Sequence, residues 1–422
     1  MTLFKTSFLN AIAVGVKMLV LLVINKVLAV YVGPAGYAAI GQFQNTIQII
    51  LSFSSGAINA GVTKYTAEYG LDSGRQRLIW SNAGTLALVA SVVISVLIIL
   101  FSEYMSVKLL GSAEFSGIFY WFAFTLTFFV FNALFLAVLN GKKETSLYVV
   151  SNISGSILSL CVTYALVVFY GLYGALLALA VYQSLTFLVT LFLCYRTSWF
   201  RLSLFLGWFD SATLKKLTKY ALMAITTALC VPVSHMLIRG HLSVEFGQDV
   251  AGYWEAVWKL SSSYLIFITT TLSVYYLPRL SELSWGKELK SEIVSGYKFV
   301  IPTVVLMAAF IYIFRSQIVA LLFSREFLAI GELLAWQLVG DVLKVTSWVL
   351  AYIMVSKAMT RLYICTEVIF SILFVLLTYQ FSSMYGVEGA VMAHAANYLI
   401  YLLVVVYLIW PKLEGRDDSV NR

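Results

Sequence analysis

Long apolar runs separated by short polar segments recur along the whole chain. Windows of about 20 apolar residues, the length that crosses a bilayer as an α-helix, occur twelve times. They lie at about 9–32, 36–62, 78–101, 118–139, 147–169, 174–194, 219–240, 252–277, 298–314, 333–355, 362–381 and 389–410. The pattern predicts an all-α polytopic membrane protein with twelve transmembrane helices. A transmembrane β-barrel would instead show segments of about ten residues with alternating polarity.

The composition agrees with this class and adds an orientation. The chain of 422 residues is 61% hydrophobic and only 11% charged, whereas soluble domains are about 45–50% apolar. With the N-terminus inside, the inner segments carry most of the 28 Lys and Arg, and the opposite loops hold only Lys108, Arg315 and Arg325. The positive-inside rule then predicts that both termini are cytoplasmic. The net charge of +8 is explained by these loops, and no nucleic-acid partner is expected.

Two motifs recur at an interval of 215 residues. KKETSLY from Lys142 matches KAMTRLY from Lys357, and YGLYGALLA from Tyr170 matches YGVEGAVMA from Tyr385. Because both matches fall at equivalent span boundaries, they predict an internal duplication. Each half has six spans, so the two lobes form a parallel repeat about an axis along the membrane normal. The predicted divisions are an N-lobe at 1–194, an amphipathic cytoplasmic linker at 195–218, a C-lobe at 219–410 and a cytoplasmic tail at 411–422.

Polar residues form a stripe along the second span, which lipid would not tolerate. The stripe predicts a water-filled cavity, and interhelical hydrogen bonding is the structural alternative. The eighth span repeats the pattern with Glu255 and Lys259, which are one turn apart and can pair. The predicted orientation places this pair nearer the periplasmic end, which favours outer gating. The second-span stripe consists of Gln42, Asn45, Gln48, Ser52, Ser55 and Asn59.

Ionisable residues inside spans cost about 2.5–3.5 kcal/mol each near the bilayer centre, so they are candidates for function. Lys17, near the middle of the first span, is the foremost, and the kink expected at Pro232 in the seventh span is a candidate hinge. Closed ion pairs, including one between Asp341 and Lys344, are the structural alternative. Basic groups outnumber acidic ones, and 15% of residues are aromatic, which suits an anionic ligand carrying sugars. The groups are Lys17, Lys26, Arg239, Lys259, Lys344, Glu255, Asp341 and Glu367.

Four stretches carry a family resemblance: VGPAGYAAIGQFQN, GVTKYTAEY, SVYYLPRLSEL and AWQLVGDVLKV. They resemble the Wzx-type flippases of bacterial polysaccharide assembly, in particular the subgroup that handles lipid III of enterobacterial common antigen. This family belongs to the multidrug/oligosaccharidyl-lipid/polysaccharide exporter superfamily. The resemblance implies two six-helix lobes working by alternating access in the bacterial inner membrane. The implied substrate is an undecaprenyl-diphosphate-linked oligosaccharide, either an O-antigen repeat unit or lipid III, moved from the cytoplasmic to the periplasmic leaflet.

The resemblance also implies roles for residues. Cationic cavity residues would hold the diphosphate, and Asn45, Gln48 and Arg239 complete the candidate substrate-binding set. Coupling to H+ or Na+ would fall on one acidic residue of the spans. No cofactor or metal is implied, and the expected partners are membrane lipid and the polysaccharide polymerase and chain-length machinery. The cationic positions are Lys17, Lys64, Lys259 and Lys344, and the coupling positions are Asp341, Glu255 and Glu367.

Three alternatives differ in what they require of the sequence. A multidrug exporter of the same superfamily usually handles cations, which the excess of basic groups disfavours. A membrane-embedded polymerase or ligase would carry catalytic residues on a large outer loop, whereas the outer loops here are short and the chain has no phosphate-binding glycine loop. A scaffold for the polymerase would not need charged faces inside the membrane.

Overall fold

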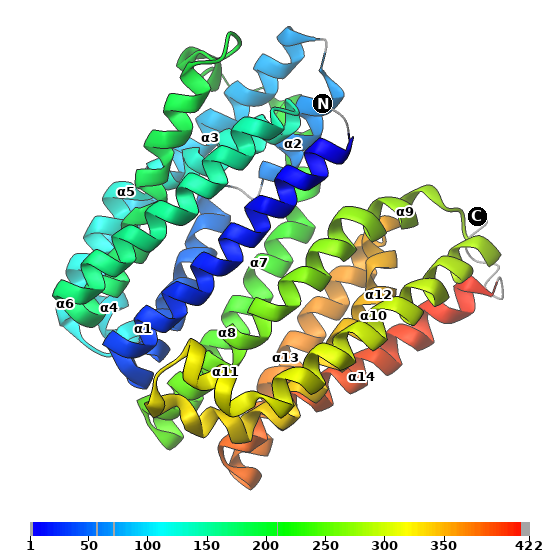
Figure 1. Cartoon of the computed structure of the whole chain (residues 1–422). Helices are drawn as coiled ribbons and strands as arrows, with labels where there is room; N and C mark the ends of the chain where they lie inside the picture. Colours follow the sequence, from blue (N-terminus) through cyan, green and yellow to red (C-terminus); the bar gives the residue numbers. More distant parts are fainter. Residues whose placement is uncertain (1–2, 56–57, 71, 209, 415–422) are drawn as a thin grey trace. The chain divides into compact units, whose positions relative to one another are not determined.

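The computed structural model describes residues 3–55, 58–70, 72–208 and 210–414, and these residues are helical apart from short connections. Parts of the predicted linker and of the predicted tail, at 209 and 415–422, lie outside the described residues. The chain divides into two compact units, Met1–Pro232 and Val233–Arg422. Figure 1 shows the helices of the first unit in blue to green and those of the second in green to red. Each unit is described by itself.

The first unit is a bundle in which α1 and α5 pack against α6, and α3 packs against α5. Its long helices are only weakly amphipathic. The face of such a helix that meets lipid and the face that meets other helices both favour apolar side chains. The elements are α1 (Leu3–Ser54), α2 (Asn59–Glu68), α3 (Ser73–Leu100), α4 (Ser102–Leu110), η1 (Ala113–Phe115), α5 (Ser116–Gly141), α6 (Thr145–Tyr195), η2 (Leu202–Phe205) and the first part of α7 (Ser211–Phe246).

Two of these helices each contain a glycine at which the chain turns back. Gly33 in α1 has φ 71° and Gly171 in α6 has φ 54°, a region that side chains with a Cβ rarely adopt. Beyond Gly33, Tyr37 Oη donates to Asn25 Oδ1 at 2.9 Å, a contact that a straight helix would not permit. Each helix therefore consists of two halves, which correspond to two of the predicted spans.

Aromatic residues from the segment after α6 complete the core of the first unit. Phe205 stacks on Trp80 with 5.8 Å between ring centroids, and Phe200 meets Phe135 edge-on at 5.3 Å. Lys142 Nζ donates to Gln76 Oε1 at 3.0 Å, close to the Trp80 ring. Part of the segment predicted as a linker is therefore packed into this unit.

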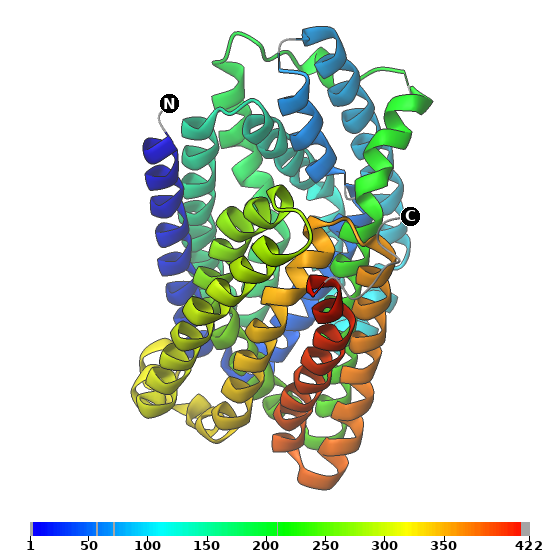
Figure 2. The ribbon, with the colours of Figure 1, turned by 90° about the vertical axis from the view of Figure 1, so that its right-hand side faces the viewer.

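The second unit is arranged around α12, which packs against α8, α10 and α14, while α13 packs against α14. Figure 2 shows α13 in orange beside α14 in red. A π-helical turn precedes Pro278, which cannot donate a backbone hydrogen bond. The elements are the rest of α7, α8 (Gln248–Thr271), η3 (Leu272–Tyr276), α9 (Leu277–Glu282), α10 (Lys287–Ile313), α11 (Arg315–Leu322), η4 (Arg325–Ala329), α12 (Ile330–Ser356), α13 (Thr360–Tyr385) and α14 (Val387–Leu413).

Within the described residues, eight helices are long and apolar enough to cross a membrane. The two longest, Ile12–Ser54 and Thr145–Tyr195, are the ones divided by Gly33 and Gly171. α7 and α8 are not among the eight, and α8 carries Glu255 and Lys259 inside it. The all-helical, polytopic class is confirmed, whereas the count of twelve spans stays a prediction.

A close approach of α3 to the segment after α6 predicts an effect on stability. A Cβ at Gly84 would lie 2.0 Å from the carbonyl oxygen of Phe205. Because backbone cannot move aside easily, we expect Gly84→Ala to lower the free energy of unfolding by about 1–3 kcal/mol. Thermal unfolding of the purified protein in detergent measures this.

The matched control is Gly15→Ala, since a Cβ at Gly15 meets no atom within 4 Å. This control is expected to melt at the wild-type temperature or slightly above it, because alanine is the better helix former. A Gly84→Ala protein with wild-type melting would contradict the packing described for η2.

Candidate functional site

A small polar pocket lies in the first unit between α1, α5 and α6. Its volume is about 170 Å³. Lys17 from α1 is the one cation among the lining residues, and its side chain is exposed. Within the described part of the chain, the Lys17 ammonium makes no ion pair. The polar lining residues are Lys17, Asn132, Ser151, Asn152, Ser156, Ser159, Tyr182, Gln183 and Thr186.

Two buried groups of this pocket have unused hydrogen-bonding capacity. Asn132 Nδ2 donates to Gln183 Oε1 at 3.3 Å, but Asn132 Oδ1 and Ser151 Oγ have no hydrogen-bond partner among the described residues. An unsatisfied buried polar atom costs about 1–3 kcal/mol. Asn152 and Ser156, by contrast, donate to backbone carbonyls of their own helix. Asn132 and Ser151 are therefore the groups that a polar ligand would satisfy.

The two halves of α6 form one wall because small residues let them approach. A Cβ at Gly155 would lie 2.8 Å from Thr186 Cγ2 across the pair. The turn at Gly171 thus brings Ser151 and Asn152 of the first half to the same pocket as Gln183 of the second half. Small residues at helix interfaces serve this purpose generally in membrane proteins.

The other predicted residues of the first unit do not line this pocket. Lys64 is exposed on α2 and its Nζ lies 5.4 Å from the Tyr65 ring centroid. Gln48 is exposed, and Asn45 is half-buried with its Nδ2 unpaired among the described atoms. The residues of the predicted polar stripe are divided between the second half of α1, the turn after it and the start of α2, and none of them lines the pocket of Lys17.

The second unit contains a buried carboxylate between two cations. Arg239 from α7 donates to Glu255 Oε2 from α8 through Nε at 3.2 Å and through a terminal nitrogen at 2.5 Å. Lys259 Nζ lies 3.8 Å from Glu255 Oε1. The Arg239 and Glu255 side chains are only 3% and 6% exposed. The predicted Glu255–Lys259 pair is present, but Arg239 is the closer partner and was not anticipated.

A second buried carboxylate, Asp341 of α12, accepts hydrogen bonds from neighbouring helices. Tyr264 Oη of α8 donates to Oδ2 at 2.8 Å, and His394 Nε2 of α14 lies 3.1 Å from Oδ1. Gln337 Nε2, one turn earlier on α12, donates to Oδ1 at 3.3 Å. Asp341 thus joins three helices of the unit.

The ion pair expected between Asp341 and Lys344 does not form within the described residues. The Lys344 ammonium lies instead over the rings of Trp258, Trp348 and Tyr398, at 4.8, 5.0 and 5.4 Å from their centroids. Cation–π attraction of this kind is strongest where water is excluded. The spacing of Asp341 and Lys344 allowed a pair, but the ammonium contacts aromatic rings of α8, α12 and α14 instead.

Trp258 connects the charged groups of the second unit. Its ring lies 4.4 Å from the His235 ring, 4.8 Å from the His394 ring and 5.7 Å from the Trp254 ring, and Arg239 sits 5.8 Å from the Trp254 centroid. Trp258 therefore contacts His394, which is a partner of Asp341, and Trp254, which lies beside the Glu255 partner Arg239. Glu367 on α13 is half-buried and makes no ion pair in the described part of the chain. Pro232 lies within α7, at the boundary between the two units.

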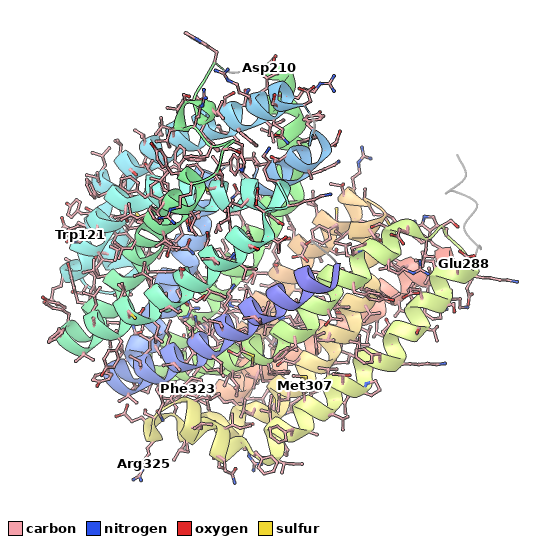
Figure 3. The ribbon with its side chains drawn as sticks, turned by 45° about the horizontal axis from the view of Figure 1, so that its top comes forward. Trp121, Asp210, Glu288, Met307, Phe323 and Arg325 are labelled. Carbon is pink, nitrogen blue, oxygen red and sulfur yellow. The ribbon has the colours of Figure 1, made fainter. Side chains whose placement is uncertain are left out.

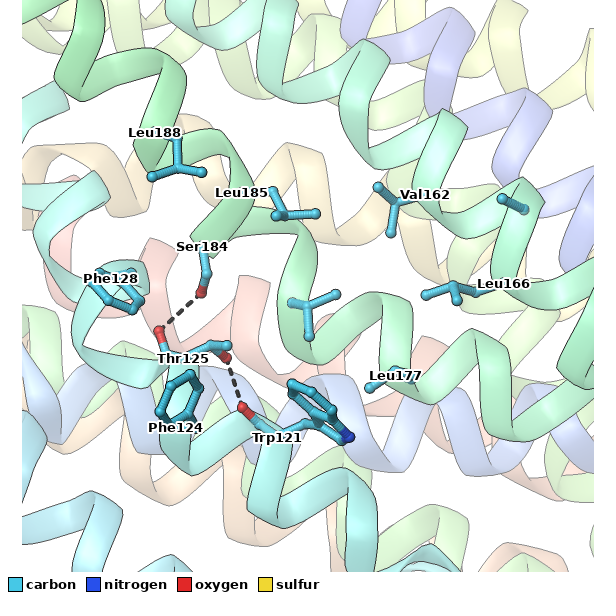
Figure 4. Close-up of a pocket in the computed structure, with 12 residues that line it drawn as sticks. Trp121, Phe124, Thr125, Phe128, Val162, Leu166, Leu177, Ser184, Leu185 and Leu188 are labelled. Carbon is cyan, nitrogen blue, oxygen red and sulfur yellow. Dashed lines mark hydrogen bonds between the residues drawn. The ribbon is translucent and has the colours of Figure 1, made fainter.

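An apolar groove of about 590 Å³ lies in the first unit between α5 and the two halves of α6 (Figure 4). Trp121, Phe124 and Leu188 line it. Its two hydroxyls are bonded to backbone: Thr125 Oγ1 donates to the Trp121 carbonyl at 2.9 Å, and Ser184 Oγ donates to the Thr125 carbonyl at 2.9 Å. The groove therefore offers hydrocarbon contact and no polar group for a glycan.

Comparison with known proteins decides the family. The family described as "Polysaccharide biosynthesis protein" matches residues 3–284, which is more than half of the chain. The chain belongs to this family.

Two curated proteins match this chain over nearly its whole length. The chain is 31% identical over 414 residues to the "Lipid III flippase" of Escherichia coli (strain K12) and, equally, to that of Shigella flexneri. The match covers 98% of this chain and 100% of each relative. The resemblance to Wzx-type flippases predicted from the motifs is thus confirmed, and these relatives indicate a transporter rather than an enzyme.

Solved structures of transporters resemble the structure of this chain. An inward-facing multidrug resistance MATE family transporter of the MOP superfamily has a TM-score of 0.77 at 15% identity, with 95% of this chain and 96% of that chain covered. An outward-facing structure gives 0.65 at 14% identity, with 97% and 95% covered. At such identities the likeness shows the fold alone. The chain is a multi-pass membrane protein with the fold of these transporters.

Several residues of these sites were not anticipated from the sequence: Asn132, Gln183, Tyr264, Trp258 and His394. Asn132 and Gln183 are polar groups inside apolar spans, and that cost could have singled them out. The sequence did not single out Trp258 or Tyr264 as site residues, because aromatic residues are common throughout the chain. Among the described residues, no group of three His, Cys, Asp or Glu side chains could hold a metal ion.

The buried Arg239–Glu255 pair predicts a strong asymmetry between mutations. Glu255→Gln leaves the Arg239 guanidinium buried without a carboxylate, and we expect this to destabilise the protein by about 3–5 kcal/mol. The double variant Arg239→Met/Glu255→Met removes both charges and is expected to recover most of that loss. Thermal unfolding of the three proteins in detergent measures the effect.

The control is Glu245→Gln, which removes an exposed carboxylate of α7 and is expected to leave stability unchanged within about 0.5 kcal/mol. If Glu255→Gln melted with the control, the pair would not be important for the unit.

Proposed function

We propose that this chain flips an undecaprenyl-diphosphate-linked oligosaccharide from the cytoplasmic to the periplasmic leaflet of the bacterial inner membrane by alternating access. The observation that carries the proposal is the 31% identity to two proteins named lipid III flippase, over 98% of this chain and 100% of each relative. The transporter fold and the polar pocket of the first unit, which Lys17 lines, support it. Two alternatives for the glycan stay open: an O-antigen repeat unit and lipid III.

The head of such a substrate is assigned to the polar pocket of the first unit. The Lys17 ammonium, which makes no ion pair with any described residue, suits a diphosphate oxygen, and Asn132 Oδ1 and Ser151 Oγ suit sugar hydroxyls. The apolar groove suits hydrocarbon alone. Lys64, Asn45 and Gln48 are proposed as further contacts along the path, since each has an exposed or half-buried polar group on α1 or α2.

The cations of the second unit are given a different role. Arg239 and Lys259 are held by Glu255, and Lys344 is held by aromatic rings. Binding a diphosphate through any of them would require these contacts to open. We therefore assign Arg239, Lys259 and Lys344 to gating that accompanies substrate passage, with Pro232 as the hinge.

Among Asp341, Glu255 and Glu367, Asp341 is proposed as the coupling residue. Its carboxylate lies 3.1 Å from His394 Nε2, and a carboxylate–imidazole pair can take up and release a proton. Glu255 is disfavoured because Arg239 binds it closely, and Glu367 because it has no such partner in the described structure. H+ is accordingly preferred to Na+ as the coupling ion.

The backbone supports the parallel duplication as part of this proposal. Gly171 and Gly386 are 215 residues apart and have φ of 54° and 64°. Lys143 and Ala358, also 215 apart, are the two non-glycine residues with positive φ in the described structure, at 62° and 51°. We propose lobes at 1–194 and 219–410, a linker at 195–218 and a tail at 411–422, with both termini cytoplasmic.

Complementation tests the proposed function and identifies the glycan. The chain would be expressed in bacterial strains lacking either the lipid III flippase or an O-antigen flippase, and the returning surface glycan would be measured. Restoration in one strain supports the proposal and names the substrate. Failure in both, with the protein correctly inserted, would contradict it, and export of fluorescent cations by reconstituted protein would favour the multidrug alternative.

Removal of the pocket cation predicts a loss of transport. We expect Lys17→Ala to reduce outer-leaflet accessibility of the lipid-linked glycan in spheroplasts at least tenfold, because the diphosphate loses its charged contact. We expect Lys259→Ala to reduce it also, through loss of gating. Membrane insertion should be preserved in both, since Lys17 makes no ion pair in the described part of the chain and Glu255 keeps its closer partner, Arg239, when Lys259 is removed.

The matched control is Lys108→Ala, an exposed lysine at the end of α4, which should transport at the wild-type level. Normal accessibility in both the Lys17 and the Lys259 variants would overturn the assignment of these sites.

A further inference from the structure

A concave basic surface lies at the start of α10 in the second unit, and its lining includes no residue of the two carboxylate sites. Figure 3 labels Glu288 at this end of the helix. The surface encloses about 470 Å³ and is lined by Lys287, Lys290, Ser291, Val294, Ser295 and Lys298. At 100° per residue these side chains fall within one face of the first three turns of α10. α10 is also one of the helices able to cross a membrane, so this face lies at the end of an apolar span.

One lysine of the surface is fixed by the last turn of α14. Lys290 Nζ donates to Glu414 Oε1 at 2.9 Å and lies 5.2 Å from the Trp410 ring centroid. Trp410 Nε1 donates to the same Glu414 oxygen at 3.2 Å. The floor of the surface is therefore an ordered contact between two helices. An indole in such a position is typical of a membrane–water interface.

The remaining polar groups of the surface have no protein partner in the described part of the chain. Lys287 and Lys298 are exposed and make no ion pair there, and the hydroxyls of Ser291 and Ser295 make no hydrogen bond there. Helical serines either donate to a backbone carbonyl one turn earlier or point to solvent, and these two exposed hydroxyls are therefore available to a ligand. These four groups are positive or neutral donors that point to a ligand with anionic oxygens.

Among the described residues, the nearby carboxylates do not pair with Lys287 or Lys298. Glu414 is bound by Lys290, and Glu292 lies 3.7 Å from Arg279 Nε. Glu288 and Glu292 are rotated about 100° and 140° from Lys287 around the helix axis. By contrast, Arg75 at the start of α3 is paired, since its Nε lies 3.2 Å from Asp72 Oδ2. The N-terminus of α10 adds its free backbone amides to the positive field.

We propose that this surface binds the phosphate headgroup of an anionic phospholipid. The ammonium groups of Lys287 and Lys298 would contact the phosphate, and the hydroxyls of Ser291 and Ser295 would donate to it. The acyl chains would lie along the apolar part of α10 beyond residue 298. The proposal does not depend on the flippase function, because it concerns a bilayer lipid and not the transported substrate.

The test measures lipid binding to the purified full-length protein in detergent by native mass spectrometry. The ligands are phosphatidylglycerol, phosphatidylethanolamine and inorganic phosphate. The proposal expects phosphatidylglycerol to bind tightest. The variant Lys287→Gln/Lys298→Gln should bind it about 30-fold more weakly, since each lysine near an anionic lipid contributes roughly fivefold.

Two further variants separate a built site from general attraction between charges. Lys108→Gln/Arg325→Gln removes two charges from exposed residues elsewhere and should bind phosphatidylglycerol as the wild type does. Ser291→Ala/Ser295→Ala keeps every charge and should weaken binding several-fold. Equal melting temperatures would show that all variants are folded. The proposal is overturned if the lysine pair changes nothing, if the control pair has the same effect, if the serine pair has none, or if inorganic phosphate binds as tightly as the lipid.

Discussion

A buried carboxylate in an apolar bundle must find donors or cations, and in the second unit this requirement fixes the arrangement of the helices. Glu255 is held by Arg239 of α7 and Lys259 of its own helix. Asp341 is held by side chains of α8, α12 and α14. Because an unpaired charge there costs several kcal/mol, the helices that supply these partners cannot separate freely. Any motion during transport has to exchange these contacts for others.

In the first unit, several polar groups have no partner among the described residues. Its pocket keeps the Lys17 ammonium exposed and leaves Asn132 and Ser151 with unused bonding capacity, while the hydroxyls of its apolar groove are bonded to backbone. The first unit thus has polar groups open to a ligand, whereas in the second unit Glu255 and Asp341 are bound by side chains of the protein. This difference is consistent with the roles proposed above for Lys17 and for Asp341.

The class, most helix positions and the family followed from the sequence, because apolar runs and motifs are local properties. The sites were only partly predictable. The polar stripe of α8 identified Glu255 and Lys259, which share a face. Tyr264, nine residues after Glu255, lies about 180° away around the helix and turns to Asp341 instead. Arg239 and His394 reach their carboxylates from other helices, and periodicity within one helix carries no information about such contacts.

The reversal at Gly171 has a consequence for how the protein is made. The two halves of α6 are joined by a turn at a single glycine, so no loop could hold one half in water while the other enters the bilayer. We expect the two halves to leave the translocon as a hairpin, with the small residues that join them already in contact. Ser151 and Gln183 line the same pocket. They would then enter the bilayer together, so neither polar side chain would be exposed to lipid alone. Correct pairing of these two halves in the bilayer would therefore depend on the turn at Gly171.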